Sequence, residues 1–200
     1  RKGTEPWQDR PLGLNLRAAL VELSRPAIAF RLLAMGAIGG LPMLYIILTP
    51  LIFSATPERQ TSDVALMVGL VAGFEVPFML ALPRLQRALS RQTLIMGGAL
   101  IYAGFVTLLA LFPNGSWLWA LPVLAGLGAA PILTLPIGYW QALMEGRPGT
   151  AAALMALQRL AGDLLAAASF ALGTTIGGYT TAALLGGGLA MAGAMALWIA

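Results

Sequence analysis

The sequence of 200 residues contains no cysteine and no histidine. Without cysteine there is no disulfide, no thiolate nucleophile and no thiolate ligand for a metal. Without histidine, a Ser–His hydrolase, a His-ligated haem or copper centre and the usual zinc sites are excluded. We therefore expect no metal, no cofactor and no enzymatic activity, including that of an intramembrane enzyme.

Charged residues are also scarce, at 10% of the chain, whereas 58% of the residues are hydrophobic. A soluble domain carries about 25% charged and roughly 45–50% apolar residues. Glycine (24) and proline (13) are both plentiful, and membrane helices tolerate both. The net charge of +4 comes with no basic patch interleaved with aromatic residues, so we expect no nucleic-acid partner. The composition predicts an all-α, polytopic membrane protein whose partner is the lipid bilayer.

Six apolar runs, each long enough to cross a bilayer, follow a basic N-terminal segment. The bilayer core is about 30 Å thick, and a helix needs about 20 residues to cross it. The runs occupy residues 32–53, 64–82, 94–112, 117–140, 150–176 and 180–200. We expect a six-transmembrane-helix bundle over 32–200, with a tight turn at 177–179. Because the chain starts without a methionine and stops inside an apolar run, we also expect it to be part of a longer protein.

The N-terminal segment, residues 1–31, is predicted to be a cytoplasmic linker with a short amphipathic helix. Leu16, Leu20 and Leu23 recur at helical spacing beside Arg17 and Glu22. Such a helix lies along the membrane surface with its apolar face toward the bilayer. A linker with no role beyond connection is the simpler interpretation, and a regulatory role is the alternative.

The distribution of Lys and Arg predicts the orientation of the bundle. Residues 1–31 hold six of them, 83–93 hold three and 141–149 hold one, whereas 54–63 hold one and the remaining turns hold none. Positive residues concentrate on the cytoplasmic side of membrane proteins. We therefore expect the N-terminal segment and the loops 83–93 and 141–149 to be cytoplasmic.

Only three charged residues lie deep inside the apolar runs: Glu75, Arg159 and Asp163. A charge at that depth costs roughly 2.5 kcal/mol or more, so chains keep one mainly where a cavity, a partner or a proton needs it. A carboxyl group removed from water holds a proton more readily, and we predict that Glu75 is the proton carrier of a transporter. The alternative is a permanently neutral Glu75 that makes a structural hydrogen bond to another helix.

Arg159 and Asp163 are four residues apart, on one face of the fifth run. Two interpretations stay open: a structural salt bridge within the helix, or a charge relay that also contacts solute. By residue count, Glu75 and Arg159 lie at similar depths. If their helices are neighbours, Glu75 would compete with Asp163 for Arg159, and the exchange of partners would link protonation to conformation.

Other polar side chains are candidates for contact with a polar solute: Tyr45, Trp140, Gln141 and Gln158. Tyr and Trp at the end of a span are more often interfacial anchors than ligand contacts. The loop 83–93 is basic because it holds Arg84, Arg87 and Arg91. This loop either follows the orientation rule alone or acts as a gating loop that pairs with acidic residues of another helix.

The six runs divide as three plus three. The second run of each triplet holds the deep charges, and the third runs, which have no charge, are expected to face lipid or support the others. Prolines interrupt the first runs at Pro42, Pro131 and Pro136. This distribution is expected of an inverted three-helix repeat. Small residues four apart, at 36/40, 69/73 and 162/166, predict close helix packing.

Three stretches carry a resemblance to a known family. They are GFEVP at 73–77 ahead of the basic loop, LYII at 44–47 with the proline at 50, and YWQALM followed by GRPGTAA within 139–152. In order and spacing they resemble the eighth helix, the seventh helix and the junction of the tenth and eleventh helices of the bacterial sugar efflux transporter family, in the major facilitator superfamily. The resemblance covers about residues 25–175.

The resemblance implies that the six runs are helices seven to twelve of a twelve-helix fold, with a central cavity shared with a missing N-terminal six-helix half of the same protein. It further implies a bacterial inner-membrane antiporter that exports sugars or sugar-like solutes in exchange for protons. The alternative is a multidrug efflux transporter of the same superfamily, which would share every topological feature. A membrane scaffold that transports nothing is a further alternative.

Overall fold

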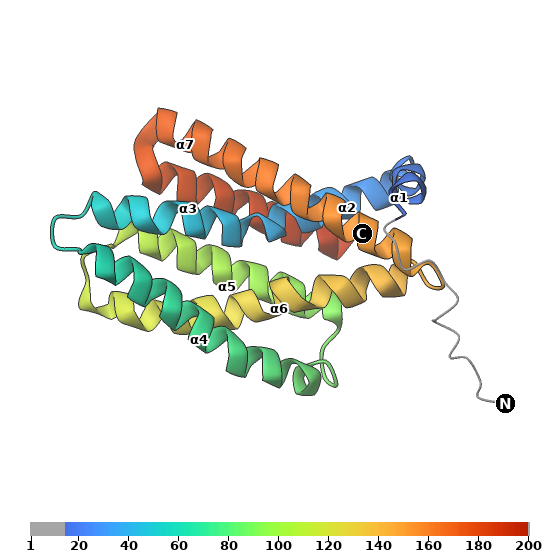
Figure 1. Cartoon of the computed structure of the whole chain (residues 1–200), viewed down its shortest axis with the longest axis horizontal. Helices are drawn as coiled ribbons and strands as arrows, with labels where there is room; N and C mark the ends of the chain where they lie inside the picture. Colours follow the sequence, from blue (N-terminus) through green and yellow to red (C-terminus); the bar gives the residue numbers. More distant parts are fainter. Residues whose placement is uncertain (1–14, 200) are drawn as a thin grey trace.

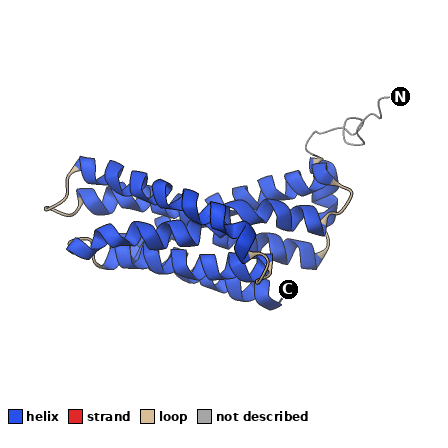
Figure 2. Ribbon diagram, turned by 90° about the horizontal axis from the view of Figure 1, so that it is seen from below, coloured by secondary structure: helices blue, strands red, loops and turns tan. Residues whose placement is uncertain are grey.

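The computed structural model describes residues 15–199, and within this range the chain is a bundle of helices without strands (Figure 1, Figure 2). The helices are α1 (Leu16–Leu23), α2 (Pro26–Gly39), α3 (Leu41–Ser54), α4 (Thr61–Leu85), α5 (Arg91–Leu111), the short 3-10 helix η1 (Ser116–Ala120), α6 (Leu121–Leu143) and α7 (Pro148–Ile199). In the described range, five helical segments are long and apolar enough to cross a membrane, with α2 and α3 taken as one segment and α7 as another. The prediction of an all-α bundle that fits a membrane is confirmed.

The longest helix, α7, folds back on itself and supplies two of the six expected crossings. Gly177 and Gly178 interrupt its helical backbone, and Gly178 has a φ of +80°. That conformation favours glycine, because a side chain would clash with the backbone. The two arms of α7 pack side by side, since a Cβ added at Gly173 would collide with Ala182. The turn predicted at 177–179 is therefore confirmed.

The first crossing differs from its predicted bounds, since it begins at Pro26 and consists of α2 and α3, which meet at Gly40 with its backbone still in the right-handed helical region. Pro26 occupies the first turn of α2, where its missing N–H costs nothing. Pro42 lies in the first turn of α3 rather than inside a continuous helix. Because a proline has no N–H, Pro42 cannot donate the helical hydrogen bond to the carbonyl of Ile38, four residues earlier.

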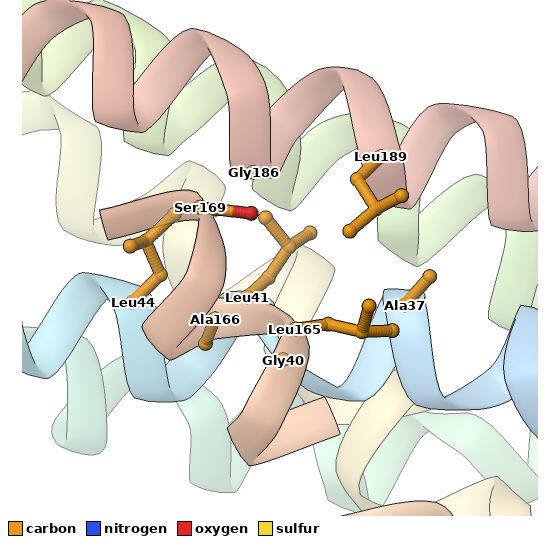
Figure 3. Close-up of a pocket in the computed structure, with 9 residues that line it drawn as sticks. All are labelled: Ala37, Gly40, Leu41, Leu44, Leu165, Ala166, Ser169, Gly186 and Leu189. Carbon is orange, nitrogen blue, oxygen red and sulfur yellow. The ribbon is translucent and has the colours of Figure 1, made fainter. Parts of the chain in front are cut away.

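Glycine contacts join the first crossing to the first arm of α7. A Cβ at Gly40 would lie 2.6 Å from the carbonyl oxygen of Gly162, so the two backbones touch directly. Figure 3 shows the adjoining seam, where side chains from α2, α3 and both arms of α7 leave a space of about 10 Å³. That space is too small for a solute. The predicted packing at 36/40 and 162/166 is thus present, whereas Gly69 and Gly73 of α4 have no atom within 4 Å of an added Cβ.

Burial differs strongly between neighbouring helices. Only 11% of the most apolar stretch of α4 is buried, whereas 56% of that of α5 is buried. In Figure 1, α4 lies along one side of the bundle, and α5 packs against α6 and α7. Of the two roles expected for the uncharged third runs, facing lipid or supporting the other helices, α5 has the second, because small and aromatic side chains such as Ala99, Tyr102 and Phe105 place it in the core.

The described basic segments gather at one end of the bundle. The helix α1, the loop after α4 and the loop after α6 lie at the end drawn on the right in Figure 1. The side chain of Gln92 at the start of α5 donates to the carbonyl of Leu197, which brings the end of α7 to the same place. The opposite end holds Arg59, whose guanidinium donates to the carbonyls of Pro113 (3.0 Å) and Gly115 (3.4 Å). Residues 1–14, which hold the other basic residues predicted for the cytoplasmic side, lie outside the described range.

The predicted amphipathic helix is present as α1, but its acidic residue faces inward. Leu16 and Leu20 are about half exposed, whereas Glu22 is buried. The Glu22 carboxylate meets the guanidinium of Arg147 at 2.5 Å and that of Arg25 at 2.9 Å. The hydrogen bond from Arg147 is the main reason that the pKa of Glu22 lies below its ordinary value. This ion-pair cluster fastens α1 to the loop between α6 and α7.

A candidate solute-binding cavity

One cavity of about 380 Å³ lies where the first, second, fourth and fifth crossings meet. Its wall includes Met43 of α3, Val71 of α4, Tyr102 of α5, Leu133 of α6 and Met155 of α7. These positions fall in the interior of the membrane-crossing segments rather than at their ends. A chain that crosses a membrane would therefore hold this space well inside the bilayer. The volume is within the range of small-molecule sites, at its lower end.

The three deep charges predicted from the sequence all line this cavity. Glu75 comes from α4, and Arg159 and Asp163 come from the first arm of α7. Glu75 and Asp163 are half-buried, and Arg159 is exposed within the chain described. The α4 and α7 helices thus contribute charged residues to the wall of one space, but they are not a closely packed pair of helices, which the predicted exchange of partners assumed.

These charges are not paired with each other. Within residues 15–199 the ion pairs are those of Glu22 with Arg25 and Arg147, near the basic end of the bundle. Arg159 and Asp163 therefore form no salt bridge, although their spacing along α7 would permit one. The structural salt bridge, one of the two interpretations of this pair, is therefore absent from the structure of the described residues.

Two further predicted residues, Tyr45 and Gln158, also line the cavity. Gln158 is buried, and its side-chain oxygen accepts a hydrogen bond of 2.6 Å from the indole N–H of Trp140. Its amide nitrogen donates to the carbonyl of Met35 at 3.4 Å. Gln158 is consequently held in one orientation at the edge of the cavity.

Trp140 and Gln141 lie outside the lining of this cavity. Trp140 is fully buried among side chains that include Leu32 and Leu154, and its indole is hydrogen-bonded to the cavity residue Gln158. It is therefore a core residue that positions Gln158 rather than an interfacial anchor. Gln141, the next residue on α6, is exposed.

Comparison of this chain with protein-family models, with curated proteins and with solved structures gave no match. Function is therefore inferred from the residues of the cavity and from their surroundings.

Residues of the wall also carry polar groups that have no charge. The Tyr45 ring packs edge-on against Tyr102 with centroids 6.2 Å apart, and the buried Tyr45 hydroxyl makes no hydrogen bond of normal geometry in the described range. Two residues of the wall, Ile46 and Ile132, have backbone carbonyls that lie four residues before Pro50 and Pro136. Since a proline has no N–H, these carbonyls lose their usual helical donor. The positions of the prolines could have revealed both carbonyls.

The three arginines of the loop 83–93 lie apart from this cavity. Arg84 and Arg87 are exposed. Arg91 donates to the carbonyl of Gly138 in α6 at 2.7 Å and more weakly to Gln86 at 3.4 Å. Arg91 also lines a second, more open cavity of about 290 Å³ between α4 and α6. In the described range the loop thus contacts α6 through a carbonyl, and none of its arginines forms an ion pair.

The chemistry available to the main cavity is therefore ionic and polar. Two carboxylates, one guanidinium and the Tyr45 hydroxyl belong to residues of a wall that is otherwise lined mainly by apolar side chains. No group of three or more potential metal-binding residues occurs within residues 15–199. Such a wall can bind a small polar or charged solute, and its carboxyl groups can exchange protons.

Proposed function

We propose that this chain belongs to a secondary active transporter that exports a small polar solute by proton-coupled alternating access. The observation that carries the proposal is that Glu75, Arg159 and Asp163 line one cavity in the interior of the bundle. Three charges in an apolar wall are costly, so a role in binding or proton exchange explains why they occur together. Sugars and sugar-like compounds are the first candidates for the solute, in keeping with the sequence resemblance.

Glu75 is the proposed proton carrier. Its neighbours along α4, Phe74 and Val76, are apolar, and its half-buried side chain makes no hydrogen bond or ion pair among the described residues. A carboxyl group in this position can hold a proton while the cavity is empty and release it when a cation or water approaches. Arg159 and Asp163 would then bind the solute or relay charge to Glu75.

Alternating access requires helices that bend or rock around the site. The junction of α2 and α3 at Gly40 and the prolines inside α4 and α6 supply such points next to the cavity. We further propose that the open side of α4 faces a second six-helix half, in an inverted-repeat arrangement like that of other transporters. The basic end of the bundle would then be cytoplasmic, in the inner membrane of a bacterium.

The proposal is tested with the full-length protein in proteoliposomes under an imposed pH gradient. If the solute is a sugar, radiolabelled lactose or glucose should accumulate with the wild-type protein, and this accumulation should stop when the gradient is dissipated. Glu75→Gln should abolish the dependence on the gradient, whereas Glu145→Gln, in an exposed loop, should transport like the wild type. Transport by Glu75→Gln that still follows the gradient would refute the role of this carboxyl group.

One observation favours a second candidate, an exporter of amphipathic drugs. Most of the cavity wall is apolar, including Met43, Ile46, Leu133 and Met155, and such a wall suits lipophilic molecules. Competition between lactose and the lipophilic cation ethidium for transport separates the two candidates. Inhibition by ethidium with no effect of lactose would favour drug export.

A further inference from the structure

The cavity presents more charge than a neutral solute can satisfy. Glu75, Arg159 and Asp163 line it together, and no ion pair joins any two of them in the described range. When a solute displaces water from such a wall, each charge left without a partner weakens binding. A neutral sugar would offer hydroxyl groups but no countercharge. The cavity is therefore better matched by a solute that carries charges of both signs.

The number and sign of the charged groups in the cavity restrict which charges the solute can carry. One guanidinium calls for one anionic group on the solute, and it can bind a carboxylate through two parallel hydrogen bonds. Two carboxylates, on α4 and α7, call for two positive groups. Because Glu75 and Asp163 come from different helices, these two positive groups would have to be separated along the solute.

We propose that the solute carries one carboxylate and two separated cationic groups, which is the charge pattern of a basic amino acid such as lysine. Its carboxylate binds Arg159, its nearby ammonium group binds Asp163, and its distal ammonium group binds Glu75. The inference rests on the proposed transport function and names the substrate class of the same cavity.

This assignment also balances charge during exchange. With Glu75 protonated and the cavity empty, the Arg159 and Asp163 charges cancel. When the solute enters, Glu75 releases its proton to water, and the net charge of +1 on the solute replaces the proton. The cavity is neutral in both states, so a proton and a basic amino acid exchange one for one without leaving charge in the apolar wall.

The remaining wall is consistent with a small solute of this kind. The space of about 380 Å³ suits a single small molecule. The Tyr45 hydroxyl, which has no hydrogen-bond partner of normal geometry among residues 15–199, belongs to a wall residue, and so do the carbonyls of Ile46 and Ile132 that the prolines leave without a helical donor. Carbonyl oxygens and aromatic rings both favour ammonium groups.

Binding of four probes to the purified full-length protein tests the inference. The probes are lysine, norleucine, which lacks the distal ammonium group, cadaverine, which lacks the carboxylate, and glucose, which has no charge. Each charge-assisted contact is expected to change affinity by roughly ten- to a hundredfold. Lysine should therefore bind at least about tenfold more tightly than norleucine or cadaverine, and glucose should bind most weakly.

Variants connect each group of the solute to its residue. In Glu75→Gln, the affinity for lysine should fall to that for norleucine, and in Arg159→Gln it should fall to that for cadaverine. Asp163→Asn should weaken lysine and norleucine alike. Arg17→Gln and Glu145→Gln change exposed charges outside the cavity, and the ranking of the four probes should be unchanged in both.

Equal binding of lysine, norleucine and cadaverine, glucose binding as tight as that of lysine, or no binding of any probe would overturn the inference. The transport assay separates this failure from failure of the proposed function. Glucose or lactose transport driven by the pH gradient, without lysine binding, would support the proposed transport function and refute the basic amino acid as its solute. Selective lysine binding without any gradient-driven transport would support the basic amino acid as the ligand of the cavity and refute the proposed transport function.

Discussion

A pair of glycine substitutions tests how the cavity is held together. Gly162 lies on α7 between Arg159 and Asp163, and a Cβ added there would lie 2.8 Å from the carbonyl oxygen of Gly36 and 3.0 Å from the nitrogen of Gly40. Gly69 on α4 has nothing within 4 Å of the same added atom. We predict that Gly162→Ala destabilises the protein, whereas Gly69→Ala stabilises it slightly.

The magnitude follows from two terms. Replacing glycine by alanine inside a helix stabilises by roughly 0.5–1 kcal/mol, and this gain is common to both variants. At Gly162 the new methyl group meets backbone atoms, which do not move aside as a flexible side chain would, so overpacking costs about 1–3 kcal/mol. The difference between the two variants isolates the contact and is expected to be about 2 kcal/mol, or roughly 4–8 °C in melting temperature for a chain of this size.

The assay is thermal unfolding of the full-length protein in detergent, followed by tryptophan fluorescence or by aggregation. Gly162→Ala should melt below the wild type and Gly69→Ala at or above it. Solute affinity should also fall in Gly162→Ala, because the shift of α7 displaces both charges of that arm. Melting temperatures that move in the same direction by the same amount in both variants would refute the backbone contact.

Three further outcomes follow from individual contacts. Glu22→Gln should lower the melting temperature at neutral pH. The folded-state pKa of Glu22 lies below its ordinary value of 4.5. The difference in melting temperature between wild type and variant should therefore be constant above pH 4.5 and should disappear as the pH falls through the lower folded-state pKa. Arg59→Gln should lower thermal stability by roughly 1–3 kcal/mol, since it loses two carbonyl contacts and its stacking on Phe53 and Trp119, and Glu58→Gln serves as its control in the same melting assay. Trp140→Phe should raise the solute KM by roughly tenfold through the lost hydrogen bond to Gln158, and an unchanged KM in transport assays would contradict that positioning role.

The helices and their turns could largely be predicted from the sequence. Apolar runs of about 20 residues leave few alternatives to a helix that crosses the bilayer, and Gly177 and Gly178 divide α7 where the run exceeds that length. The deep charges pointed to the cavity because burial of a charge in an apolar run is expensive wherever it occurs. Their common depth could be counted along each run.

Contacts between distant helices could not be read from the sequence in the same way. The bond from Trp140 to Gln158 joins two helices, and the pattern around Trp140 fits an interfacial anchor equally well. The amphipathic pattern of α1 includes Glu22 but gives no partner for it, and its partner Arg147 lies 125 residues away. The absence of a salt bridge between Arg159 and Asp163 depends on rotamers and on the shape of the cavity, which residue spacing does not determine.

The exposed position of α4 could not be predicted from its sequence either. In a membrane helix, apolar residues face lipid and protein alike. The mean hydropathy of α4 is therefore nearly the same as that of the more buried α5. Only the three-dimensional packing distinguishes the side of α4 that contacts α6 from the side that is open.

The central claim is that Glu75 gives up a proton when solute enters the cavity. It is tested most directly by measuring the protons released when a transported solute is added to the purified full-length protein in weakly buffered solution. The account predicts release of about one proton per bound solute by the wild type and by Glu145→Gln, and none by Glu75→Gln. Undiminished release by Glu75→Gln, or binding with no release by the wild type, would contradict it.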